Sequence, residues 1–130
     1  MNRFKKILIY SSLFAVSAFI ALFIVTSLSI GNSVEKNCQM AQDKYPDNCT
    51  QALISYLQDK DNSYRSRNSA IWALGQLGDP QATKVLQSYY TGTVPPRESL
   101  DQDLSQLELK KAIKLTKGGI NLTRPIWKNL

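Results

Sequence analysis

Histidine is absent from the 130-residue sequence. Histidine is the commonest general base near neutral pH and the commonest metal ligand, so its absence weakens the case for catalysis or metal binding. Asp101, Asp103 and Glu108 are spaced as solvent-facing helix charges, not as a buried carboxylate pair, and no phosphate loop or nucleophile motif is present. We therefore predict no enzyme activity, cofactor, metal or small-molecule substrate.

Charge is absent between Lys6 and Glu35. The apolar residues of this interval, 7–30, would form a helix of about 36 Å, which spans a hydrocarbon core of about 30 Å with some tilt. The run predicts an uncleaved transmembrane helix, that is, a signal anchor. The alternative is a cleaved secretory signal, with Ser27-Leu28-Ser29 as the cleavage triplet, but the apolar regions of such signals cover only about 7–15 residues.

Positive charge is concentrated on one side of the apolar run. Arg3, Lys5 and Lys6 precede it, whereas Glu35 and Lys36 follow it and cancel. Positive residues stay in the cytoplasm, so we predict that the rest of the chain is extracytoplasmic, either periplasmic or extracellular. The expected organisation is a cytoplasmic N-terminus (1–6), a single-pass transmembrane helix (7–30), a juxtamembrane segment (31–47), a helical domain (48–117) and a C-terminal tail (118–130).

Cysteine is scarce: Cys38 and Cys49 are the only two. Their spacing matches no zinc motif, and no histidine is available to complete such a site. In an oxidising compartment the default interpretation is one disulfide, which would close a short loop and stabilise the fold by about 2–3 kcal/mol. The alternative is two buried free thiols.

Helical periodicity dominates the chain after Pro46, which predicts an all-α fold. Gly78 is a typical left-handed helix end, and Asp79 followed by Pro80 is a typical helix start. Ser99 with Gln102 fits a capping box for the last helix, and Ile126 and Trp127 are expected to fold back onto the last helices. The predicted helices cover residues 48–59, 64–77, 80–90 and 100–116.

Two successive helix pairs, 49–77 and 80–116, follow from these bounds, and neither can bury its apolar face alone. The stretch Tyr64 to Leu86 reads YRSRNSAIWALGQLGDPQATKVL. It resembles the HEAT-like repeats grouped with phycobilisome-lyase repeats, through Ala70, Ala73-Leu74-Gly75 and Leu77-Gly78-Asp79. The resemblance implies a short α-solenoid of about two helix pairs that binds proteins by its concave face, and it does not imply lyase activity.

The helix at 64–77 has a face directed away from its alanine and leucine stripe. This face combines one tryptophan with an arginine and two amides, a composition typical of protein interfaces. The alternative is that Trp72 packs under a neighbouring helix as part of a thin core. The predicted partner-binding residues are Arg65, Asn68, Trp72 and Gln76.

Basic residues gather near the C-terminus, whereas residues 32–103 are slightly acidic. A solvated helix face that complements the helix dipole is one interpretation, and contact with anionic lipid through Lys110, Lys111 and Lys114 is another. Nucleic acid is not expected as a partner, because no base-reading motif is present.

Together these features predict a membrane-anchored, non-catalytic scaffold or adaptor module that binds a protein partner in the cell envelope. The alternative is a structural subunit of a larger membrane complex that assembles through the transmembrane helix itself. Capture of a partner by the soluble domain alone would favour the first, and a requirement for the span would favour the second.

Overall fold

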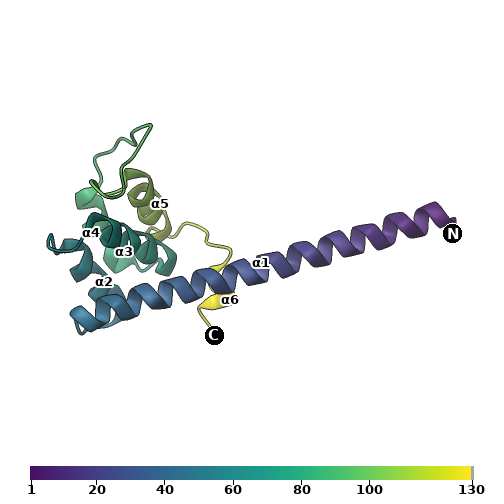
Figure 1. The fold of residues 1–130 in the computed structure, drawn as a ribbon, viewed down its shortest axis with the longest axis horizontal. Coiled ribbons are helices and arrows are strands. Elements are labelled where there is room, and N and C mark those ends of the chain that lie inside the picture. The colour runs from purple at the N-terminus through teal and green to yellow at the C-terminus, as the bar shows by residue number, and fades with distance from the viewer. Residues whose placement is uncertain (130) are drawn as a thin grey trace.

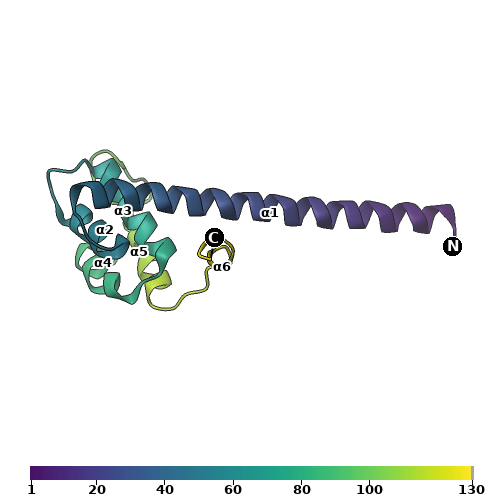
Figure 2. The same ribbon diagram turned by 90° about the horizontal axis from the view of Figure 1, so that it is seen from below.

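The computed structural model describes residues 1–129, and every regular element within them is a helix (Figure 1). The all-α prediction is therefore confirmed for this part of the chain. A small domain gathers at the C-terminal end of one long helix, whose N-terminal half extends away from it (Figures 1 and 2). The elements are α1 (Arg3–Lys44), α2 (Cys49–Gln58), α3 (Tyr64–Leu77), the 3₁₀ helix η1 (Pro80–Ala82), α4 (Thr83–Tyr89), α5 (Gln106–Thr116) and α6 (Arg124–Trp127).

The long helix α1 continues through residues 31–44, beyond the apolar run, because neither proline nor a turn sequence interrupts it. Its buried residues, Ser27, Val34 and Ala41, recur every seven positions and therefore lie on one face. This face packs against α2, α3 and α6. The residues predicted as a juxtamembrane segment thus form one wall of the domain.

The apolar half of α1 contacts almost nothing else in the chain. It contains an 18-residue window of mean hydropathy 2.4, of which 6% is buried. Large side chains such as Phe14 and Phe19 are 75% and 71% exposed. The core helix of a soluble protein would be mostly buried, so this helix is a candidate membrane span, although an N-terminal signal sequence can also form an apolar helix of this kind.

Local sequence signals place α2 and α3 within one residue of their predicted bounds. The Asn48 side chain caps α2, and Gly78 ends α3 in the left-handed conformation with φ 63°. The Asp79 carboxylate accepts the N–H of Gln81 at 2.9 Å, which confirms Asp79 as the next cap. The third predicted helix starts as the 3₁₀ turn η1 before it becomes α4.

The last helix starts later than predicted. It was expected at residue 100 with a capping box at Ser99 and Gln102, but α5 begins at Gln106 and its cap is Ser105. The Ser105 hydroxyl oxygen accepts the N–H of Glu108 at 3.1 Å. The preceding residues, including Leu100, instead form an exposed turn.

The core lies where α3 packs against α2 and α5, and where α4 packs against α5. Its centre consists of aliphatic side chains with no solvent exposure: Leu53, Leu57, Ile71, Leu74, Leu86 and Leu109. Alanines at the helix contacts, among them Ala70 and Ala73, let the backbones approach closely. Burial of these side chains supplies the main favourable term for the fold.

The two cysteines join α1 to α2. Cys38 lies on α1, Cys49 is the first residue of α2, and their Cα atoms are 5.1 Å apart with the sulfur atoms paired. This pairing fits the predicted disulfide and not two free thiols. The bond ties the long helix directly to the domain.

The tail does not fold onto the last helices as predicted. After α5 it extends toward the N-terminal half of α1, and α6 packs against α1 (Figure 2). A Cβ added to Gly31 would lie 2.5 Å from the Cβ of Trp127, so only glycine fits beneath this ring. The prediction missed this contact because it joins positions far apart in the sequence, and helical periodicity does not register such contacts.

Candidate functional site: a groove around Trp72

Two adjoining hollows flank Trp72, and together we call them the Trp72 groove. One hollow, of about 460 Å³, lies between α1 and α3, and the other, of about 290 Å³, lies between α3 and α5. Trp72 and Glu108 line both of them. The remaining lining residues are Ser33, Asn37, Arg65, Asn68, Ser69 and Leu100 in the first, and Gly75, Gln76, Lys111, Ala112, Lys114, Leu115 and Ile120 in the second.

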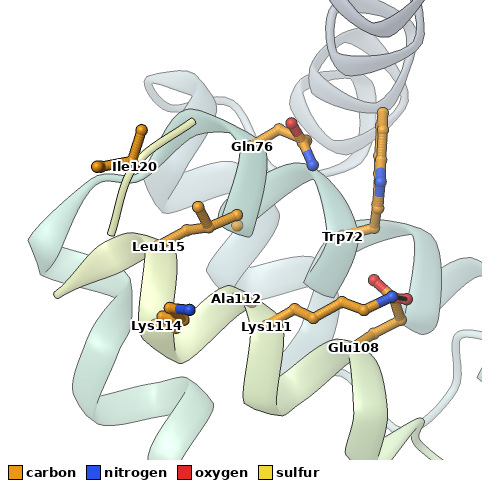
Figure 3. A pocket seen from close by; sticks show the side chains of 9 residues that line it. Trp72, Gln76, Glu108, Lys111, Ala112, Lys114, Leu115 and Ile120 are labelled. Atoms are coloured by element: carbon orange, nitrogen blue, oxygen red, sulfur yellow. Dashed lines mark hydrogen bonds and ion pairs between the residues drawn. The ribbon is translucent and has the colours of Figure 1, made fainter. Parts of the chain in front are cut away.

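The indole of Trp72 is half-buried. It projects from α3 toward α1 and away from the side chains of α5 (Figure 3). Its neighbours Ile71 and Ala73 are fully buried and point into the core. The packing of α3 therefore directs Trp72 to the rim of the core, with part of its surface open to the groove. Such a ring offers a large apolar contact area with little loss of conformational entropy on binding.

Arg65 and Asp101 form an exposed ion pair at one end of the groove. Arg65 Nε donates to Asp101 Oδ1 at 2.8 Å, and Nη2 donates to Oδ2 at 3.2 Å. The hydrogen bond and the charge of Arg65 lower the pKa of Asp101, and the carboxylate raises the pKa of Arg65. An ion pair this exposed adds little to stability, so either group is free to exchange its partner for another ligand.

Asn68 holds the loop that forms one rim of the groove. Its Nδ2 donates to the carbonyl oxygens of Leu100 and Asp103 at 3.1 and 2.9 Å, and its Oδ1 accepts the N–H of Ser105 at 2.7 Å. Because Asn68 is 7% exposed, these contacts replace the hydrogen bonds that water would make. The Asn68 amide is therefore hydrogen-bonded within the chain, and it fixes the loop at the rim of the groove.

Gln76 lies at the opposite end and holds the tail. Its Oε1 accepts from Asn121 Nδ2 at 2.9 Å, and its backbone carbonyl accepts from Arg124 Nε at 2.9 Å. The cation of Arg124 thereby satisfies a free carbonyl at the C-terminus of α3, where the helix dipole favours positive charge. The tail connection is fixed against α3 by these two contacts.

The three lysines proposed for lipid contact lie on α5 but differ in their surroundings. Lys111 Nζ pairs with Glu108 Oε1 at 3.0 Å inside the groove. Lys114 lines the hollow between α3 and α5, and Lys110 is exposed outside it. All three are accessible to solvent, and their contact with lipid remains a prediction.

Sequence reasoning missed the contribution of α1 to the groove. Ser33 and Asn37 line the first hollow, yet they fall in the segment that was not assigned to a helix. The sequence did contain a signal for this part of the helix, because no residue between Gly31 and Lys44 breaks a helix. Glu98 was also missed: its carboxylate accepts the N–H groups of Gln106 and Leu107 and so fixes the start of α5.

A second polar cluster lies at the far end of α1, away from the groove. The Tyr45 hydroxyl donates to the Asp59 carboxylate, and Lys44 Nζ lies 3.4 Å from it. The hydrogen bond from Tyr45, followed by one from the backbone of Asp61, lowers the pKa of Asp59. The cluster connects α1 to the turn after α2.

Residues 66–90 match the model of the PBS lyase HEAT-like repeat family. The match covers most of α3, all of η1 and α4, and the turn between them. The chain therefore contains a HEAT-like repeat, and the residues Trp72 and Gln76 of the groove lie within it. No curated protein and no solved structure matches the chain.

The repeat bears on catalysis as well as on binding. HEAT-like repeats are generally a non-catalytic fold associated with protein interaction, although the name of this family refers to a lyase. Among residues 1–129, no group of three or more His, Cys, Asp or Glu is placed to hold a metal ion. The groove itself presents one exposed carboxylate–arginine pair, one carboxylate–lysine pair and an indole.

Proposed function

We propose that the chain is a membrane-anchored, non-catalytic adaptor whose extracytoplasmic domain binds a protein partner in the Trp72 groove. The observation that carries the proposal is the position of this groove, which opens on the matched repeat between α1, α3 and α5. An indole surrounded by exchangeable ion pairs is the composition of a binding hot spot.

The anchor is residues 7–30 of α1, oriented with the N-terminus in the cytoplasm. The exposed apolar surface of this helix supports insertion in lipid, and the disulfide supports an oxidising compartment for the domain. The helix pairs around α3 act as a short α-solenoid. Arg65, Trp72 and Gln76 contact the partner at the groove, and Asn68 contributes by holding its rim.

A second candidate is a structural subunit that assembles through α1. It is favoured by one observation: the side chains of residues 3–22 are exposed around the whole helix, so neighbouring transmembrane helices could pack on any side. In that case the partner contacts would require the span. The domain without residues 1–30 would then capture nothing.

Replacing Trp72 with alanine tests the first candidate. We expect a loss of partner affinity of about thirtyfold or more, the effect of about 2 kcal/mol that defines a hot spot, with an unchanged thermal melt. The measurement is photo-crosslinking in native membranes from a benzoylphenylalanine at Ser69, which lines the groove. The matched control carries the crosslinker at Gln87, which is exposed on α4.

The adaptor proposal predicts a protein adduct at Ser69 that disappears in the Trp72→Ala variant, and no such adduct at Gln87. A collapsed melt would instead show that Trp72 belongs to the core. Equal adducts at both positions would show that binding is not centred on the groove.

A further inference from the structure

The tail segment 118–129 lies on the side of the domain that faces the apolar half of α1 (Figures 1 and 2). Trp127 packs on Gly31, one residue after the end of the apolar run. Ser27, one turn earlier on the same face, is fully buried. If residues 7–30 cross the bilayer, α6 is therefore at the level of the lipid headgroups.

The position of α6 at the headgroups follows from the length of the apolar run, residues 7–30. A helix over residues 7–30 is about 36 Å long, which exceeds a hydrocarbon core of about 30 Å by several ångströms. The end of the run therefore emerges into the interfacial layer. Tryptophan is enriched at that depth, because its ring is apolar and its N–H is polar.

The tail also exposes the apolar side chains that an interface would cover. Ile120 and Leu122 are 85% and 72% exposed, more than any other large hydrophobic residue described after α1. They flank Asn121, which Gln76 fixes to α3, so the segment presents them from a rigid base. In water these two side chains would have no apolar environment.

The charged residues of the tail and of the C-terminal part of α5 are all basic. Lys114 and Lys117 precede the segment, Lys128 follows α6, and all three are exposed. No Asp or Glu occurs in residues 109–130. Exposed cations beside exposed aliphatic groups complement an anionic headgroup layer above acyl chains.

We propose that residues 118–129 are an interfacial membrane contact, in which Ile120 and Leu122 enter the boundary between headgroups and acyl chains while Lys114, Lys117 and Lys128 contact lipid phosphates. The proposal rests on the membrane span of the proposed function. Because α6 is fixed to α1 at Gly31 and the tail to α3 at Gln76, this contact holds the domain at one height and tilt on the bilayer.

The test uses the full chain in nanodiscs of phosphatidylcholine and phosphatidylglycerol, with a benzoylphenylalanine at Ile120 or Leu122. We expect a phospholipid adduct at both positions by mass spectrometry, as at Phe14 within the span. Asp61 is the control for the far side of the domain. It neighbours Asn62, which contacts Lys44 at the end of α1, about 20 Å beyond Gly31 by helix rise. No lipid adduct is expected at Asp61.

The outcomes separate this inference from the span. An adduct at Phe14 without one at Ile120 or Leu122 overturns the tail contact and leaves the anchor intact, whereas no adduct at Phe14 overturns both. A protein adduct at Leu122, which lies outside the Trp72 groove, with no lipid adduct in native membranes would assign this surface to a protein. A preference for phosphatidylglycerol that disappears when the three lysines become glutamine supports the phosphate contact, and an unchanged preference contradicts it.

Discussion

Replacing Gly75 with leucine is expected to destabilise the domain by about 3 kcal/mol or more, because the residue packs directly against the backbone of α5. A Cβ at this position would be 2.9 Å from both the Cα and the Cβ of Ala112. The neighbouring atom is backbone, so it cannot rotate away as the end of a flexible side chain can. The two helices would have to separate, which would open the core around Leu74 and Leu109.

The measurement is denaturant unfolding of the full-length protein in detergent micelles, followed by the fluorescence of Trp72 and Trp127, the only two tryptophans. Gln87→Leu is the matched control, because it adds the same side chain to an exposed helix position and should change stability by no more than about 0.5 kcal/mol. Equal midpoints for the two variants would mean that α3 and α5 do not pack at Gly75.

Removing the disulfide is the second large perturbation, with an expected loss of about 2–3 kcal/mol in the double variant Cys38→Ser, Cys49→Ser. The bond joins residues 11 positions apart and restricts the unfolded chain around the turn between α1 and α2. Both cysteines also pack against the core, so loss of the bond loosens the wall that α1 contributes.

Reduction of the wild-type protein provides the matched comparison. A reductant should lower the wild-type stability to that of the double variant and should leave the double variant unchanged. Two thiols that react with maleimide before reduction, in protein taken directly from membranes, would contradict the pairing.

Short-range signals were enough to predict α2 and α3. A polar cap before each helix and Gly78 after α3 act within a few residues, so their effect can be read from the sequence. The same holds for Asp79 and the turn that follows it. The family match at residues 66–90 lies in this well-predicted part of the chain.

The start of α5 could not be predicted in this way. Leu100, Leu104 and Leu107 have helical spacing, but the residues up to Asp103 form a turn held by the buried amide of Asn68. Glu98 then caps α5 from outside the helix. Both contacts span several to dozens of positions, and local periodicity contains no information about them.

The groove was predicted in part. Placing Arg65, Asn68, Trp72 and Gln76 on one helix needed only the helical repeat. Their different surroundings depend on the loop after α4, on the tail and on α1. The positions of these three segments relative to α3 could not be predicted from the sequence. Contact of these residues with a partner remains a prediction, which the crosslinking experiment tests.

The anchor, the tail contact and the location of the groove all depend on one claim. Residues 7–30 cross a membrane, and the domain lies outside the cytoplasm. Protease treatment of sealed cells that express the protein with an N-terminal and a C-terminal tag measures this directly. We predict that the full-length chain stays in the membrane after alkaline extraction, and that external protease removes the C-terminal tag while the N-terminal tag persists. A full-length soluble chain, or a C-terminal tag protected until lysis, would contradict it.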